Sequence, residues 1–316
     1  MKKFFTVLTI ALSIMQSHAQ QTEIRRSEYR IMDDDGNFKN VVQLEIGGRY
    51  FYDIDENTHT AIFKRWYGRE NDTELIIPSS IDYNGVTYKV VALGDEAGNQ
   101  NEKLEKVIIP EGVTRIKGFA YCHGLKNITI PSSVKEIGSN AFKECVELES
   151  VVLPEGLSTL GYRAFYNCVK LKSIVIPSSV ARIESGVFYN CQQLSSITIP
   201  STISEIGEEV FYNCTSLKKV ELPRNLTALN GSVFQNCSSL VEIVIPEGVT
   251  KIDSGLFYSC NSLTDIYCYS DMPPEIDGSL YGVPLEQVTV HVPVVKKYKK
   301  DISWKAFGKL VPILWL

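Results

Sequence analysis

Residues 171–193 read LKSIVIPSSVARIESGVFYNCQQ, and the apolar positions of this stretch recur along the chain with a period of 23 residues. Its cysteine belongs to a set with that same spacing: Cys122, Cys145, Cys168, Cys191, Cys214, Cys237 and Cys260. Phenylalanine stands three residues before each of them, and leucine stands three residues after. A fixed period of this length predicts a solenoid, in which every repeat stacks on the one before it.

The spacing within one repeat predicts its local structure. Ile174 and Ile176 flank a single residue, which is the period of a strand with one buried face. Pro177 follows directly and ends the strand, because proline has no N–H for the ladder. The next apolar pair returns the chain along the other side of the coil. Residues 187–191 have helix-like spacing, for which we expect one helical or 3₁₀ turn.

A single repeat should not fold alone. About eight apolar side chains per coil contribute roughly 2 kcal/mol each on burial. Ordering the backbone of one repeat costs roughly 1 kcal/mol or more per residue, which is at least as much in total. Stability should therefore belong to the stack of coils.

The repeat resembles that of the BspA-like family of bacterial leucine-rich repeat proteins, and the resemblance covers about residues 75–293. It implies a right-handed leucine-rich-repeat solenoid that is rich in β structure. One face would carry a parallel sheet, and the other short strands with 3₁₀ or helical turns. The resemblance also implies protein–protein interaction or adhesion at or outside the bacterial surface. The cysteine slot is similar to the position that asparagine often holds in leucine-rich repeats.

The first 19 residues have the features of a secretory signal peptide. Lys2 and Lys3 form a charged start, an apolar run follows, and Ala19 completes a small-x-small cleavage motif. The apolar run is too short to span a bilayer. We therefore expect cleavage after Ala19 and a protein that is secreted or held at the cell surface, without an integral membrane segment.

The remaining chain divides by its fit to the period. We expect an N-terminal β cap over residues 20–74, the solenoid over 75–293 and a C-terminal cap over 294–316. Asn84-Gly85 predicts a type I′ hairpin turn near the first coil. In the tail, a helix and large apolar side chains such as Trp304 and Phe307 should cover the last coil.

The charge excludes one class of partner. Lys and Arg number 32 against 37 Asp and Glu. Removal of the signal peptide takes away Lys2 and Lys3, so that 30 basic residues face 37 acidic ones and the net charge is −7. Nucleic-acid binding depends on basic surfaces, so we expect none. We expect a monomer that binds a protein or glycan macromolecule.

The cysteines are predicted to pack in the interior of the coils and to form neither disulfides nor a metal site. Exported cysteines usually form disulfides, and equivalent cysteines on neighbouring coils would come within disulfide range. Their side chains should run parallel, however, so we favour buried free thiols that act as small hydrophobes. A zinc site needs convergent ligand pairs, and the sequence has no C-x₂-C. We expect no metal and no cofactor.

No catalytic constellation is recognisable in the sequence. His59, His123 and His291 lie in different parts of the predicted stack, so a shared site is implausible. Neither a nucleophile elbow nor a phosphate loop is present. We therefore expect that the protein is not an enzyme. The alternative is an enzyme or an inhibitor whose site lies in the N-terminal cap.

Two stripes are candidate binding sites. The first is the solvent face of the sheet, at the position seven residues after each cysteine: Val152, Val175, Val244 and Tyr267. The alternative is that valine merely favours strands. The second stripe is Tyr166, Tyr189, Tyr212 and Tyr258, which could bind protein or glycan or simply cover the coil edge. The asparagines beside these tyrosines should bond local backbone groups.

Overall fold

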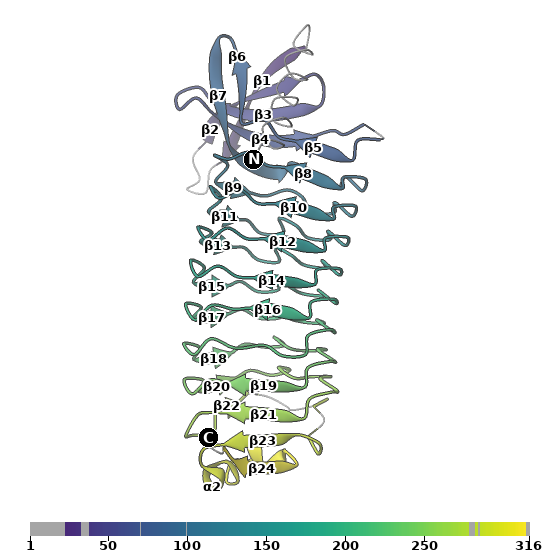
Figure 1. The fold of residues 1–316 in the computed structure, drawn as a ribbon. Helices are drawn as coiled ribbons and strands as arrows, with labels where there is room; N and C mark the ends of the chain where they lie inside the picture. The colour runs from purple at the N-terminus through teal and green to yellow at the C-terminus, as the bar shows by residue number, and fades with distance from the viewer. Residues whose placement is uncertain are drawn as a thin grey trace, which may run out of the picture.

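The computed structural model describes residues 23–32, 38–69, 71–98, 100–277, 282–283 and 285–313. The predicted signal peptide, residues 1–19, lies outside the described residues. The molecule is a long stack of coils with a β region at its N-terminal end (Figure 1). The C-terminal elements close the opposite end of the stack.

The N-terminal region is an antiparallel sheet. Its strands are β1 (Ile24–Met32), β2 (Phe38–Ile46), β3 (Tyr50–Asp55) and β4 (Thr60–Trp66). Leu44, Tyr52 and Phe63 occupy facing positions on three strands, and all three are buried. Because side chains alternate along a strand, this sheet turns one face to the core that it shares with the coils.

The sheet continues into the solenoid without a break. It includes a hairpin of β6 (Ser80–Tyr83) and β7 (Val86–Glu96), and β7 pairs in parallel with β4 and with β9 (Arg115–Ile116). The turn residues Asn84 and Gly85 both have positive φ, at 50° and 77°. The predicted type I′ turn requires this conformation, and the predicted hairpin is confirmed.

The solenoid has two columns of short parallel strands (Figure 1). One column contains β5 (Glu74–Ile76), β8 (Lys106–Ile108), β10 (Asn127–Thr129), β12 (Ser150–Val152), β14 (Ser173–Val175) and β16 (Ser196–Thr198), then β19 (Glu242–Ile245), β21 (Asp265–Cys268) and β23 (Thr289–Val292). The other contains β9, β11 (Glu136–Ile137), β13 (Thr159–Leu160), β15 (Arg182–Ile183), β17 (Glu205–Ile206), β18 (Ala228–Leu229), β20 (Lys251–Ile252) and β22 (Glu275–Ile276). The predicted β solenoid is confirmed.

The segment from phenylalanine to cysteine differs from the prediction. The Cys191 N–H donates to the Phe188 carbonyl at 3.1 Å, which closes one four-residue turn. Asn190, the third residue of that turn, has φ of 58°, which no helical or 3₁₀ turn allows. The Phe188 N–H bonds to Val210 of the next coil. The predicted helical turn is therefore wrong: bonding between coils replaces bonding along a helix.

A phenylalanine ladder fills the centre of the stack. The rings at this position stack nearly parallel from coil to coil, with centroids 5.3 Å apart for Phe142 and Phe165 and 6.2 Å apart for Phe234 and Phe257. Each of these side chains is at most 4 % exposed. Burial on this scale is the main contribution to the stability of the fold.

The cysteines line the same interior. All eight are buried and free, as predicted. Burial raises the pKa of the Cys122 and Cys260 thiols to about 12. The thiols of Cys145 and Cys214 also have a raised pKa for the same reason. An ionised thiolate would be costly in this interior, so the side chains stay protonated.

The C-terminal tail differs in part from the expected helix. It has α2 (Val295–Tyr298) of four residues, the 3₁₀ turn η1 (Trp304–Ala306), and β24 (Lys309–Pro312). Strand β24 pairs in parallel with β23 and so adds one more rung to the sheet. The large side chains Trp304 and Phe307 are buried, as predicted, and Tyr298 is buried with them. In the described part of the chain, no helix has the length and apolar character needed to cross a membrane.

Candidate interaction surface

Val152 and Val175 lie side by side on the solvent face of the sheet. Strands β12 and β14 pair so that Ser150 lies beside Ser173, and this register also sets Val152 beside Val175. The two valines are 79 % and 60 % exposed, the largest exposed fractions of any described valine. Thr129 lies beyond Val152 on β10. The structure therefore joins two predicted site residues into one apolar patch.

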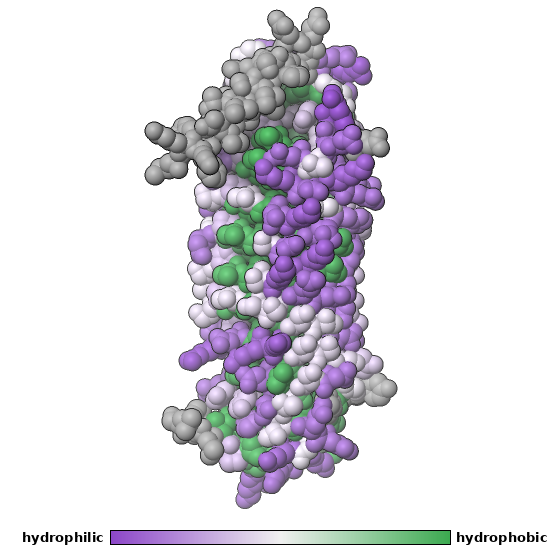
Figure 2. All heavy atoms as spheres, turned by 45° about the vertical axis from the view of Figure 1, so that its right-hand side comes forward, coloured by the Kyte–Doolittle hydropathy of each residue, from purple (hydrophilic) through white to green (hydrophobic). Residues whose placement is uncertain are grey.

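Charged side chains run beside this patch. Lys172 Nζ lies 2.7 Å from Glu149 Oε2, and Lys126 Nζ lies 3.1 Å from Glu105 Oε2. The Lys172 side chain lowers the pKa of the Glu149 carboxyl through its hydrogen bond. Figure 2 shows apolar side chains in a row along the solenoid, with hydrophilic ones beside it. Exposed ion pairs stabilise a fold little, but they give a surface a defined charge pattern.

The other two predicted residues of this stripe do not join the patch. Val244 on β19 and Tyr267 on β21 are direct partners in the sheet, and both are half-buried. The Tyr267 ring stacks on His291 with centroids 4.2 Å apart. Residues 217–223, which form no strand, separate them from β16.

The predicted tyrosine stripe is a continuous stack over three coils. The ring centroids of Tyr166 and Tyr189 are 4.7 Å apart, and those of Tyr189 and Tyr212 are 4.4 Å apart. All three side chains are half-buried, and burial raises the pKa of Tyr189 to about 12. Gln235 occupies the equivalent position between Tyr212 and Tyr258. The stacked rings cover each other's faces and leave mainly their edges to solvent.

The asparagines beside the tyrosines form a ladder between coils. The Asn213 side-chain amide donates to Asn190, Asn190 donates to Asn167, and Asn167 donates to the Glu144 carboxylate. We expected these amides to bond local backbone groups, and that prediction is wrong. Stacking at a fixed period aligns identical side chains, so each amide finds its partner one coil away.

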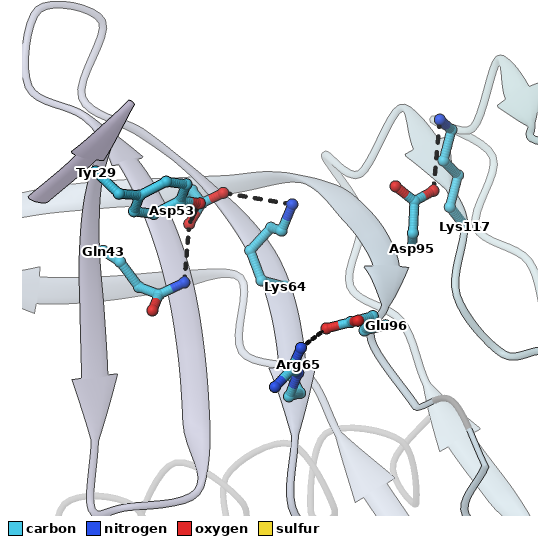
Figure 3. Close-up of polar contacts among 8 residues, drawn as sticks. All are labelled: Tyr29, Gln43, Asp53, Lys64, Arg65, Asp95, Glu96 and Lys117. Carbon is cyan, nitrogen blue, oxygen red and sulfur yellow. Dashed lines mark hydrogen bonds and ion pairs between the residues drawn. The ribbon is translucent and has the colours of Figure 1, made fainter. Parts of the chain in front are cut away.

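Sequence reasoning missed a buried carboxylate in the N-terminal sheet. Asp53 on β3 is 9 % exposed and accepts hydrogen bonds from the Tyr29 hydroxyl at 2.8 Å and the Gln43 amide at 3.3 Å. Lys64 Nζ lies 3.5 Å from its other oxygen. Figure 3 shows these side chains converging on Asp53 from β1, β2 and β4. Asp53 thus ties four strands together.

Two hollows border the cluster formed by Asp53 and its partners. The larger, of about 540 Å³, has Asp53, Val41 and Arg115 in its lining, and the smaller, of about 370 Å³, has Tyr29 and Lys64. The smaller hollow is also lined by charged side chains that are already paired. Arg65 pairs with Glu96, and Asp95 pairs with Lys117 (Figure 3). These charges support the local structure and leave few free groups for a substrate.

No metal centre is formed by the described residues. Among them, no group of three or more His, Cys, Asp or Glu side chains is arranged to hold an ion. The predicted absence of a cofactor stays a prediction.

Comparison with known proteins identifies the repeats. The model of the BspA type leucine rich repeat region matches residues 91–215, 158–274 and 182–298. A T. pallidum leucine-rich repeat protein structure is 27 % identical, with 68 % of this chain and 88 % of that chain covered and a TM-score of 0.50. The structure of a leucine-rich repeat protein from Bacteroides ovatus is 24 % identical. The match covers 84 % of this chain and 77 % of that chain, with a TM-score of 0.46. The structure of a leucine rich cell surface protein from Faecalibacterium prausnitzii is 23 % identical. The match covers 90 % of this chain and 95 % of that chain, with a TM-score of 0.33. No curated protein matches the chain.

Proposed function

Because this chain belongs to the bacterial BspA type leucine-rich repeat family, we propose that it is an exported, non-catalytic protein that holds a protein partner on its solenoid sheet. The observation that carries this proposal is the exposed pair Val152 and Val175 on two neighbouring inner strands, β12 and β14, of a six-stranded sheet. Apolar side chains of this kind become the desolvated centre of a protein interface. The ion pairs beside them supply its polar rim.

Rigidity of the sheet supports the same function. Each strand of this six-stranded sheet is bonded to its neighbours through backbone hydrogen bonds, and the other face of the sheet is buried in the core. The side chains of Val152 and Val175 are thus held in place before any partner arrives. A preorganised surface loses little entropy on binding, which favours affinity from a small apolar patch.

The predicted signal peptide supports the location that we propose. Cleavage after Ala19 would release residues 20–316 outside the cytoplasm, in solution or at the cell surface. We propose adhesion to host or neighbouring cells as the setting in which the sheet face binds its partner.

The two alternatives receive less support. A glycan site on the tyrosine stripe needs open ring faces, and Tyr166, Tyr189 and Tyr212 cover one another. An enzyme or inhibitor site in the cap needs free polar groups, whereas Asp53 and Arg65 are already bonded within the sheet. The valine patch is the stripe whose side chains are free to be buried by a partner.

Binding of purified residues 20–316 to a panel of extracellular-matrix proteins and intact bacteria tests the proposal. We expect saturable retention by at least one member of the panel. The double variant Val152→Lys/Val175→Lys should reduce it at least tenfold, because lysine places a charge in the patch. Val241→Lys is the matched control, since Val241 is also exposed, at 44 %. The absence of any retained partner would contradict the proposal.

A further inference from the structure

The exposed face around the two valines has a symmetric sequence pattern. Across β10, β12, β14 and β16, one row of outward side chains reads Thr129, Val152, Val175 and Thr198, all of them exposed. The row therefore reads the same in both directions along the solenoid axis. The neighbouring outward row has Ser150 and Ser173 at its centre. A surface with such symmetry is complementary to a copy of itself after a half-turn.

We propose that a second copy of this chain docks on this face, an inference that rests on the proposed binding role of the same surface. The two copies are related by a twofold axis that runs parallel to the strands and passes between β12 and β14. This axis reverses the order of the coils, so Val152 meets Val175 of the second copy, and Thr129 meets Thr198. The four valines then bury one another at the centre of the contact.

The charges beside the valines obey the same symmetry. Glu149 comes opposite Lys172 of the second copy, while it keeps its own Lys172 at 2.7 Å. Four charges of alternating sign then surround one edge of the contact. One coil further out, Lys126 comes opposite Ser195, and both residues are exposed. The reversal thus sets unlike charges against each other at the centre of the contact and no like charges in the next coil of this row.

The same symmetry also limits the size of the contact. Beyond the four central strands it sets Lys106 on β8 opposite Lys219 of the second copy, which is a pair of like charges. We therefore confine the contact to β10, β12, β14 and β16. We expect this contact between four short strands of each copy to bury less than the roughly 800 Å² per partner that stable complexes bury. We expect a reversible dimer with a dissociation constant on the order of 10 μM or weaker, so the monomer predicted from the sequence persists in dilute solution.

Analytical ultracentrifugation of purified residues 20–316, from about 1 μM to about 1 mM protein, tests the inference. The mean mass of the unaltered protein should rise from that of a monomer toward that of a dimer. Glu149→Lys and Lys172→Glu should each weaken the association at least tenfold, because each sets like charges together. The double variant Glu149→Lys/Lys172→Glu should restore it, because the swapped charges are again complementary. Val241→Lys should have no effect.

Two outcomes would overturn the inference: a protein that stays monomeric throughout, or a charge-swapped double variant that fails to regain association. Thermal unfolding of each variant checks that these exposed substitutions leave the fold intact. The ultracentrifugation experiment contains no other protein. If no dimer forms, the proposed binding of a foreign partner is still tested independently by retention on the matrix and bacterial panel. A dimer that Val152→Lys disrupts, together with no retention on that panel, supports the inference and removes the foreign-partner function.

Discussion

The Cys191 thiol donates a hydrogen bond to the carbonyl oxygen of Phe165, one coil earlier in the stack, with sulfur and oxygen 3.2 Å apart. The cysteines of the other repeats behave alike; Cys214, for example, bonds to Phe188. The same phenylalanine oxygen also accepts the N–H of the cysteine three residues later in its own coil. The cysteine slot thus combines small apolar volume with a weak donor that joins successive coils.

Thiol labelling should separate free cysteines from disulfides. All eight cysteines are buried and free, so iodoacetamide should add no group to the folded protein and eight groups to the protein unfolded in guanidinium without reductant. Intact-protein mass spectrometry counts the added groups. Fewer than eight groups after unfolding would mean that disulfides form in the stack.

The thiols should also make stability fall at alkaline pH. Burial raises the pKa of Cys122 and Cys260 to about 12, whereas thiols in an unfolded chain ionise near pH 8.5. Between these values the folded state holds more protons, so the stability is complete below about pH 8.5 and is lost as the pH rises. Each buried thiol should contribute a loss of about 1.4 kcal/mol per pH unit.

The variant Cys191→Ala provides the matched comparison for this pH effect. Burial also raises the pKa of the Cys191 thiol, so removing it should reduce the slope by about 1.4 kcal/mol per pH unit. Urea unfolding between about pH 8 and pH 10 measures the slope. Equal slopes for the variant and the unaltered protein would show that the Cys191 thiol ionises in the folded state.

The phenylalanine ladder should dominate the energetics of the core. Phe188 is fully buried, and its ring centroid lies 5.9 Å from those of both Phe165 and Phe211. Phe188→Ala should therefore lower the free energy of unfolding by about 3–5 kcal/mol. Val175→Ala, at an exposed position, should change it by less than about 0.5 kcal/mol. Denaturant unfolding compares the two, and similar losses would contradict the assignment of Val175 to the outer face.

Gly186 makes room for a side chain that spans two coils. Arg163 passes over Gly186 and reaches Glu209, with Nη2 and Oε2 3.6 Å apart. A Cβ on Gly186 would lie 2.9 Å from Arg163 Cγ, and the φ of Gly186 is +64°. Gly186→Ala should thus destabilise the protein by about 1–2 kcal/mol.

Gly231→Ala is the control for this effect. The nearest atom to a Cβ at Gly231 would be 3.6 Å away, and its φ lies outside the left-handed region. Alanine there should leave stability unchanged or raise it by up to about 1 kcal/mol. Equal thermal midpoints for the two variants would remove the proposed steric role of Gly186.

Sequence periodicity was sufficient to predict the fold, because a solenoid converts a period directly into contacts between neighbouring coils. The burial of Phe188 and Cys191 and the Asn84-Gly85 hairpin turn followed from local rules alone. The added strand β24 did not, since its pairing with β23 depends on how the tail folds back and carries no repeat spacing. The Asp53 cluster was equally hidden, because its members come from four strands whose register is set by the fold.

The candidate site was predicted only as a stripe. Val152 and Val244 hold the same repeat position, yet Val152 is mostly exposed and Val244 is half-buried. Val244 lies beside the large Tyr267 ring on the next strand, whereas Val152 lies beside Thr129 and Val175. The exposure of a side chain at one repeat position thus depends on the size of its neighbours on adjacent coils. The repeat consensus does not contain this information, because neighbouring coils differ at these positions.

Variants of the two stripes measure directly which face of the solenoid binds the partner. Dissociation constants for a retained partner should be compared for the unaltered residues 20–316, Val152→Lys/Val175→Lys, Val241→Lys and Tyr189→Ala. We predict at least tenfold weaker binding for the double valine variant and unchanged binding for the other two. Full affinity in the double valine variant, with binding lost in Tyr189→Ala, would contradict binding at Val152 and Val175 and place the site on the tyrosine stack.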